Sequence, residues 1–308
     1  MAIYPYQRTI KNPISCSGIG IHSGKPVNLS LKPAPENHGV RFIRSDLPGK
    51  PEVKALFNQV VDTSLATVIG HDGCIVSTIE HLMGCLAGFY IDNVRVEIDA
   101  YEMPILDGSA AQYARMIRDA GIQEQPVPRC FIVIREAIEL KDGDKFVGAY
   151  PADCFQLSCT IDYAHPLIRR QTLSMEISEN SFGNEIANAR TFGFLFEVER
   201  LKQMGLAKGG SLENAIVIDD HAVLNPGGLR YSDEFVRHKV LDCIGDFSLL
   251  GMPIIGHIKV HKSGHAFNLA FLKTLFAKKK SWETSTFIPS KPSDCRQNSL
   301  LFDSGSAI

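Results

Sequence analysis

The segment 233–250 carries three residues that could hold or transfer charge. His238, Asp242 and Asp246 are spaced by four residues each, so on a helix they lie on one stripe. Apolar residues of the same segment form a second stripe, which would face a core. An imidazole nitrogen and a carboxylate oxygen one turn apart suit zinc, and a catalytic zinc ion takes three protein ligands. A solvated polar face is the simpler alternative for this stripe taken alone.

Glu80 and His81 lie near the start of a helix predicted over 77–87. Ser77, followed by Glu80 three residues later, fits a capping box, in which Glu80 would serve only backbone donors. In the alternative, His81 is a third metal ligand and Glu80 is a base that deprotonates the attacking water. Adjacent helical residues diverge by about 100°, so both could reach one ion only near the helix start.

A third candidate, His265, lies in a loop between a predicted strand, 254–260, and a predicted helix, 266–277. A histidine there could hold charge, stabilise an oxyanion or protonate a leaving amine. The alternative is an ordinary surface histidine. Polar or glycine-rich stretches beside apolar runs indicate little by themselves; they are 20–24, 189–194 and 208–211.

The elements that must position these residues recur in the same order in both halves of the chain. The predicted order is helix, strand, helix, over 77–87, 93–98 and 110–120 and again over 233–250, 254–260 and 266–277. We infer an α+β fold of two duplicated domains, 1–126 and 127–308, each a sheet with a helical layer. The helices are expected to pack between the two sheets. Residues 123–128 are expected to form the linker.

The second half also contains an insertion at about 194–219. A helical segment, 196–204, is followed by several glycines and an apolar strand, 215–218. This small β-α-β unit could form a lid or a binding wall. The polar tail after Phe287 is expected to be loose.

The composition is that of an ordinary globular protein. Of 308 residues, 44% are hydrophobic and 21% are charged, which excludes a largely disordered chain. The net charge of −2 is not that of a nonspecific polyanion binder, so no nucleic-acid partner is expected. Eight cysteines without a C-x-x-C pair are typical of buried thiols in a reducing compartment.

The chain shows no secretory signal at its N-terminus, and no stretch approaches the ~20 apolar residues that span a bilayer. We therefore expect a cytoplasmic protein without stable membrane insertion. No pattern defines the oligomeric state, and a monomer is favoured.

Taken together, these motifs resemble one family, the UDP-3-O-acyl-N-acetylglucosamine deacetylases, which are the zinc amidases of lipid A synthesis. The matching strings run in order over roughly 4–287: GIGIHSG (18–24), STIEHLMGCLAG (77–88), IDNVRVEID (91–99), PILDGSA (104–110), ARTFGF (189–194), KGGSLENAIV (208–217), DEFVRHKVLDCIGD (233–246) and HKSGHAFN (261–268). Each string alone is weakly specific, but the ordered set is highly specific. The family fold, two layers facing each other, agrees with the duplication inferred above.

The resemblance implies a reaction and a cofactor. The N-acetyl group of UDP-3-O-acyl-N-acetylglucosamine would be hydrolysed, giving acetate and UDP-3-O-acyl-glucosamine. One zinc ion per chain would be held by His81, His238 and Asp242.

The resemblance also implies roles for further residues. Glu80 would be the general base, and Thr191 would supply a hydroxyl that helps to hold the oxyanion. His265 would be the charged group on the amine side, oriented by Asp246. The implied substrate contacts are Lys239 and Lys262 on the nucleotide-sugar, Phe192, Gly210 and Ser211 on the sugar, and Leu195, Val198, Ala215 and Val217 along an acyl-chain passage.

Two alternatives stay open at this point. One is a zinc amidase that acts on another N-acyl amino sugar, and the other is a catalytically silent protein that binds nucleotide-sugars or acyl chains. The presence of Glu80 and of all three ligand residues favours an enzyme. The sequence leaves open the preferred acyl length, the metal used in the cell and the division of proton transfer between Glu80 and His265. Departures from the family pattern, none of which carries chemistry, are Cys85, Tyr90, Ala100 and Tyr101.

Overall fold

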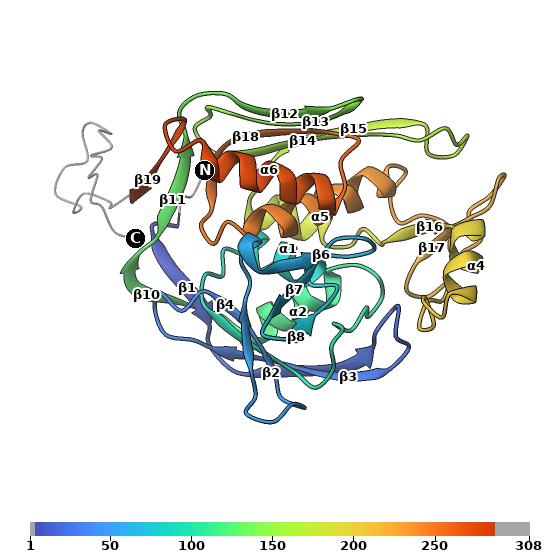
Figure 1. Ribbon diagram of the computed structural model, residues 1–308, viewed down its shortest axis with the longest axis horizontal. Coiled ribbons are helices and arrows are strands. Elements are labelled where there is room, and N and C mark those ends of the chain that lie inside the picture. Colours follow the sequence, from blue (N-terminus) through green and yellow to red (C-terminus); the bar gives the residue numbers. More distant parts are fainter. Residues whose placement is uncertain (1–3, 287–308) are drawn as a thin grey trace.

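The computed structural model describes residues 4–286, and its outer layers are two β-sheets (Figure 1). The first sheet has the strand order β2 (Ile14–Ile19), β3 (Pro26–Pro33), β9 (Val94–Ile98), β4 (Val40–Arg44) and β5 (Glu52–Lys54). Alternate residues of β3, Val27, Leu29 and Leu31, are buried. Because every second side chain is buried, one face of the sheet packs against the core.

The second sheet is larger and mixed. It runs β12 (Ile138–Asp142), β13 (Lys145–Tyr150), β18 (Ile254–His261), β11 (Cys130–Ile134) and β19 (Trp282–Thr286), and β14 (Phe155–Asp162) and β15 (Arg170–Glu176) extend it beside β18. Strand β18 pairs in parallel with both β11 and β14 and antiparallel with β13. Strand β18 therefore connects the strands β11 and β19 to the strands β12–β15 in one sheet.

Four helices fill the space between the sheets: α1 (Glu80–Gly88), α2 (Ala111–Ala120), α5 (Glu234–Ser248) and α6 (His265–Ala277). Two glycines allow α1 and α5 to approach closely. A Cβ on Gly84 would lie 2.8 Å from a Leu241 methyl, and a Cβ on Gly245 would lie 2.2 Å from the Glu80 carbonyl oxygen. The first turn of α1 is thereby held against α5. The predicted α+β fold is confirmed.

The order α1, β9, α2 returns as α5, β18, α6. This repetition supports our proposal that residues 1–126 and 127–308 are two duplicated domains. The segment expected to be their linker is itself a strand, β10 (Ile122–Pro128), which pairs antiparallel with β1 (Tyr6–Ile10). That pairing joins residues more than a hundred positions apart, so the local sequence did not indicate it.

The predicted order of the insertion is confirmed. Strand β16 (Phe192–Phe194), helix α4 (Leu195–Gln203) and strand β17 (Ile216–Ile218) form a β-α-β unit, in which the two strands are parallel. The unit projects from one end of the molecule, at the right of Figure 1. The tail after Phe287, expected to be loose, lies outside the described residues.

Helix α1 begins three residues later than predicted. Its N-cap is Ile79, with no side-chain cap, and Thr78 has a φ of 63°, which lies outside the helical region. The Ser77 amide donates to the Tyr101 carbonyl at 2.8 Å. The Ser77 amide therefore already has a partner outside the helix, and Ser77 is not the N-cap residue. The predicted capping box between Ser77 and Glu80 is wrong, and the Glu80 carboxylate is available to other partners.

The remaining elements are short. Three of them form a small sheet, namely β6 (Val60–Asp62), β7 (Val68–His71) and β8 (Cys74–Val76), and the others are η1 (Phe57–Gln59), α3 (Glu179–Ser181) and η2 (Phe182–Ile186). Within residues 4–286, no helix is both long enough and apolar enough to cross a membrane.

Candidate metal centre and active site

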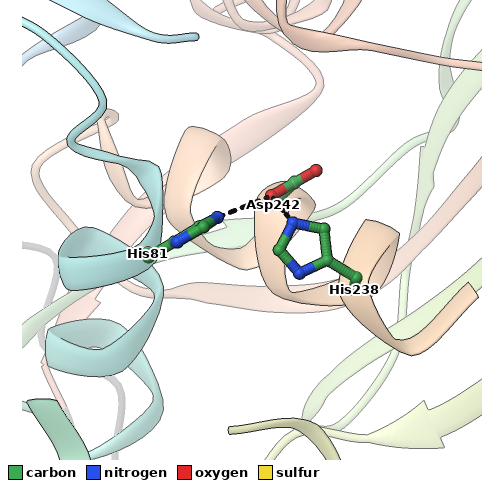
Figure 2. Close-up of side chains that lie close together, drawn as sticks. All are labelled: His81, His238 and Asp242. Atoms are coloured by element: carbon green, nitrogen blue, oxygen red, sulfur yellow. Dashed lines mark ion pairs between the residues drawn. The ribbon is translucent and has the colours of Figure 1, made fainter. Parts of the chain in front are cut away.

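Three buried side chains meet where α1 crosses α5. Figure 2 shows His81 of α1 pointing across to His238 and Asp242, which lie one turn apart on α5. The Asp242 Oδ1 atom is 3.2 Å from His238 Nε2 and 3.8 Å from His81 Nε2. The nearest ligand atoms of the three residues all lie within 4.8 Å of one another. The predicted ligand set is therefore assembled in one place.

The hydrogen bonds around this group leave one acceptor without a donor. Among the described residues, no hydrogen bond reaches the buried Asp242 Oδ1, although Asp242 Oδ2 accepts one from Lys239 Nζ at 2.8 Å. His238 donates from Nδ1 to the Ala189 carbonyl at 3.1 Å, so its Nε2 atom faces Asp242 and is the atom that can bind a metal. An unpaired buried acceptor costs about 1–3 kcal/mol. A cation bound between these atoms would remove that cost, and a His-His-Asp set suits zinc.

Burial and neighbouring charges keep His81 and Asp242 in the protonation states that metal binding requires. Burial and the His238 ring lower the pKa of His81 to about 3. Burial alone would raise the pKa of Asp242, but His238 and Lys239 hold that pKa well below its usual range. A neutral imidazole and an ionised carboxylate are the forms that bind a metal.

Glu80 lies at the first position of α1, beside the ligand His81. Its Oε2 atom accepts a hydrogen bond from the Thr67 amide at 3.1 Å. Burial raises the pKa of Glu80 to about 7, against the opposing effect of the His265 charge. A carboxylate that titrates near neutral pH is suited to general base catalysis.

His265 opens α6 and faces Glu80 from the other side of the site, with 3.8 Å between His265 Nε2 and Glu80 Oε1. Its Nδ1 donates to Asp246 Oδ2 at 2.8 Å. Burial by itself would lower the pKa of His265, but Asp246 raises it to about 10. The imidazole is therefore protonated at neutral pH, and its Nε2–H faces Glu80.

The stretch before β16 runs past the metal ligands. The Ala189 carbonyl binds His238, and the Phe192 ring lies 6.5 Å from the His238 ring, centroid to centroid. Thr191, between them, is anchored by its main chain: its amide donates to the Gly108 carbonyl and its carbonyl accepts from Ile216, each at 2.8 Å. Thr191 therefore belongs to the segment that contacts His238, and the role of its hydroxyl stays a prediction.

The predicted substrate residues lie at different distances from this centre. Lys239 contacts Asp242 and lies 5.5 Å above the Phe192 ring, so both belong to the site. Lys262 instead binds Asp144 at 2.8 Å, in loops at the end of the second sheet. The remaining candidates belong to the loop that leads to β17 or to the insertion itself, where Leu195, Val198, Gly210 and Ala215 are partly exposed, Ser211 is exposed and Val217 is buried.

Two residues of the site were missed from the sequence. Thr67 binds both Glu80 and Asp246, and Asn268 donates to Asp246 Oδ2 at 2.8 Å. Asn268 lies three residues after His265 on α6, a spacing that could have indicated it. Thr67 lies in a stretch without a motif, and no local signal indicates it.

A buried His-His-Asp group with a carboxylate beside it is typical of a metalloenzyme of the hydrolase class. Comparison with known proteins specifies the family. The model of the family described as "LpxC: UDP-3-O-acyl N-acetylglycosamine deacetylase" matches residues 7–277. The chain belongs to this family, and it is a deacetylase.

Curated relatives carry the same description, UDP-3-O-acyl-N-acetylglucosamine deacetylase. The chain is similar to that of Myxococcus xanthus (strain DK1622), with 52% identity over 277 residues, which cover 90% of this chain and 88% of the relative. The protein of Acidithiobacillus ferrooxidans (strain ATCC 53993 / BNL-5-31) is 50% identical over 279 residues, covering 90% and 92%. That of Anaeromyxobacter dehalogenans (strain 2CP-C) is 48% identical over 271 residues, covering 88% and 87%.

Proposed function

We propose that this chain hydrolyses the N-acetyl group of UDP-3-O-acyl-N-acetylglucosamine in lipid A synthesis, giving UDP-3-O-acyl-glucosamine and acetate. Its cofactor is one zinc ion held by His81, His238 and Asp242. Membership of the family and the names of the relatives support the reaction. The observation that carries the metal assignment is the buried Asp242 Oδ1, which lacks a hydrogen-bond donor and lies 3.2 Å from His238 Nε2.

Zinc, when bound, lowers the pKa of a coordinated water to ~7 and polarises the amide carbonyl. Glu80 takes a proton from the attacking water through Oε1, because Oε2 is occupied by the Thr67 amide. The water oxygen then adds to the acetyl carbon. The Thr191 hydroxyl donates a hydrogen bond to the oxygen that becomes negative in this step.

His265 completes the reaction on the amine side. Its Nε2–H, 3.8 Å from Glu80 Oε1, donates a proton to the amide nitrogen as the carbon–nitrogen bond breaks. The products are acetate and the free amine of the sugar. Asp246 holds the imidazole through Nδ1 and stabilises its charge.

The remaining candidates bind the substrate. Lys239 and Lys262 contact the nucleotide-sugar, and Phe192, Gly210 and Ser211 form the wall beside the sugar. Leu195, Val198, Ala215 and Val217 line a passage for the acyl chain. Large apolar side chains support the last role, since on the insertion Phe196 is 65% and Met204 is 63% exposed. Apolar surface of this kind usually marks a site that binds an apolar partner. The protein acts as a monomer on this small-molecule substrate.

Acetate release from the acylated nucleotide-sugar tests the proposal. The Glu80→Gln variant keeps the shape of the side chain but removes the base, so we expect kcat/KM to fall by about 10²- to 10⁴-fold while zinc content is unchanged. Glu97→Gln is the matched control, because Glu97 pairs with Lys32 on the outer sheet; it should retain full activity. A wild-type enzyme that releases no acetate, or a Glu80→Gln variant of wild-type activity, would contradict the proposal.

A further inference from the structure

Thr67, the residue before β7, is a buried threonine that bonds to three parts of the active site. Its side chain and main chain are almost fully enclosed, with 2% of the residue exposed. The amide donates to Glu80 Oε2 at 3.1 Å, and the carbonyl accepts from the Ile79 amide at 3.4 Å. The hydroxyl donates to Asp246 Oδ1 at 2.6 Å. One residue thus contacts the proposed base, the start of its helix and the partner of the proposed acid.

The main-chain contacts determine where Glu80 points. Because the Thr67 amide occupies Oε2, the second oxygen, Oε1, is the one that faces His265 Nε2 across 3.8 Å. Strand β7 follows Thr67 directly and pairs with both β6 and β8. The donor is therefore anchored to a sheet rather than to a free loop, and it orients the carboxylate before substrate binds.

The hydroxyl contact determines where His265 points. With Oδ1 of Asp246 taken by Thr67, the other oxygen accepts both the His265 Nδ1–H and the Asn268 amide, each at 2.8 Å. The Thr67 hydroxyl is also 3.2 Å from His265 Nδ1. Hydrogen bonds to a charged acceptor are short and directional, so the carboxylate cannot rotate without losing one of them.

We infer that Thr67 is a positioning residue of the deacetylation, which holds Glu80 and His265 at the separation that their proton transfers need. The inference rests on the proposed function. None of the hydrogen bonds of Thr67 within residues 4–286 joins His81, His238 or Asp242, so its role is separate from metal binding. It acts through its neighbours and not on the substrate.

The test is the isosteric variant Thr67→Val, measured as the zinc-loaded enzyme on the acylated nucleotide-sugar. It keeps the main-chain contacts to Glu80 and Ile79 and removes the hydroxyl contacts to Asp246 and His265. We expect kcat to fall by about 10- to 100-fold, a loss typical of removing a hydrogen bond that orients an active-site residue. KM and zinc content should be unchanged. Thr67→Ser restores the hydroxyl and should restore kcat. In an Asp246→Ala background, which already lacks the carboxylate that accepts from Thr67, Thr67→Val should add little.

Thr9→Val is the matched control for a purely structural effect. Thr9 is a buried threonine on β1 whose hydroxyl accepts a hydrogen bond from the Ala34 amide at 3.1 Å. The Thr9→Val variant should have a lower melting temperature than wild type and the same kcat. If Thr67→Val behaves in the same way, the inference is wrong. Should the valine variant not fold, Thr67→Ala removes the same hydroxyl, and an undiminished kcat there overturns the inference. An inactive wild-type enzyme would instead reject the proposed function.

Discussion

Two of the buried charged clusters within residues 4–286 differ in their hydrogen bonding. In the cluster around Arg129, the guanidinium binds both oxygens of Asp92 at 2.8 and 2.6 Å, and its other donors reach the carbonyls of Tyr4 and Tyr90. The Arg8 amide adds a further bond to Asp92 at 2.7 Å. In the metal cluster, by contrast, Asp242 Oδ1 accepts no hydrogen bond from any described residue.

This difference separates a structural role from a chemical one. Buried polar groups are normally hydrogen-bonded, and an exception requires a specific explanation. The Arg129 cluster is complete, and it ties the start of β11 to the segment before β9 and to the N-terminal residues. The cluster of His81, His238 and Asp242 has an acceptor without a donor, which supports its proposed role in binding a cation. Variants of the two clusters should therefore behave in opposite ways.

The largest effect on stability is expected from Arg129→Met. It leaves the largely buried Asp92 carboxylate without its partner, and breaking a buried ion pair in this way costs about 3–5 kcal/mol. We expect the free energy of unfolding, measured in urea, to fall by this amount. The folded fraction should still bind one zinc ion per chain. A variant that is as stable as wild type would remove the distinction between the clusters.

A smaller effect of opposite sign is expected from Glu80→Gln in metal-free protein. Burial raises the pKa of Glu80 from 4.5 to about 7, so the folded state binds this proton more tightly than the unfolded state does. The group therefore contributes most stability below the unfolded pKa and loses that contribution as pH rises through the folded one. Above neutral pH the variant should be more stable than wild type by about 1–3 kcal/mol. Near pH 4, urea unfolding should show little difference; a less stable variant at high pH would contradict this account.

The pH dependence of kcat/KM should sharpen the comparison further. In the proposed mechanism Glu80 is ionised and His265 is protonated, so the rate should rise through the pKa of Glu80 and fall through that of His265, about 10. Each limb changes about tenfold per pH unit. The charge of bound zinc favours the carboxylate and should shift the acidic limb below the metal-free value of about 7. His265→Gln should abolish the alkaline limb, and a variant that keeps it would exclude His265 as the acid.

The parts of the site that were predictable from sequence are those encoded by local spacing. His238 and Asp242 lie one helical turn apart, and the apolar residues around them in the sequence show which face of α5 is buried. Thr67 could not be found in this way, since it lies 179 positions from Asp246 in the chain. Only the tertiary structure brings them together.

The fold shows the same limit. The helices and strands around the site follow periodic patterns and were predicted closely, whereas β10 was mistaken for a linker because its partner β1 is distant in sequence. Ser77 was expected to cap a helix, but its amide pairs with Tyr101 instead. In both cases a tertiary hydrogen bond outweighs the local pattern.

The most direct test of whether the unpaired oxygen of Asp242 belongs to a metal site is zinc binding to chelator-stripped protein, measured by titration calorimetry. We expect wild type and Arg129→Met to bind one zinc ion per chain, and we expect His238→Ala to lose this binding while remaining folded. A wild-type protein that binds no zinc, or a His238→Ala variant that binds it as wild type does, would contradict the account.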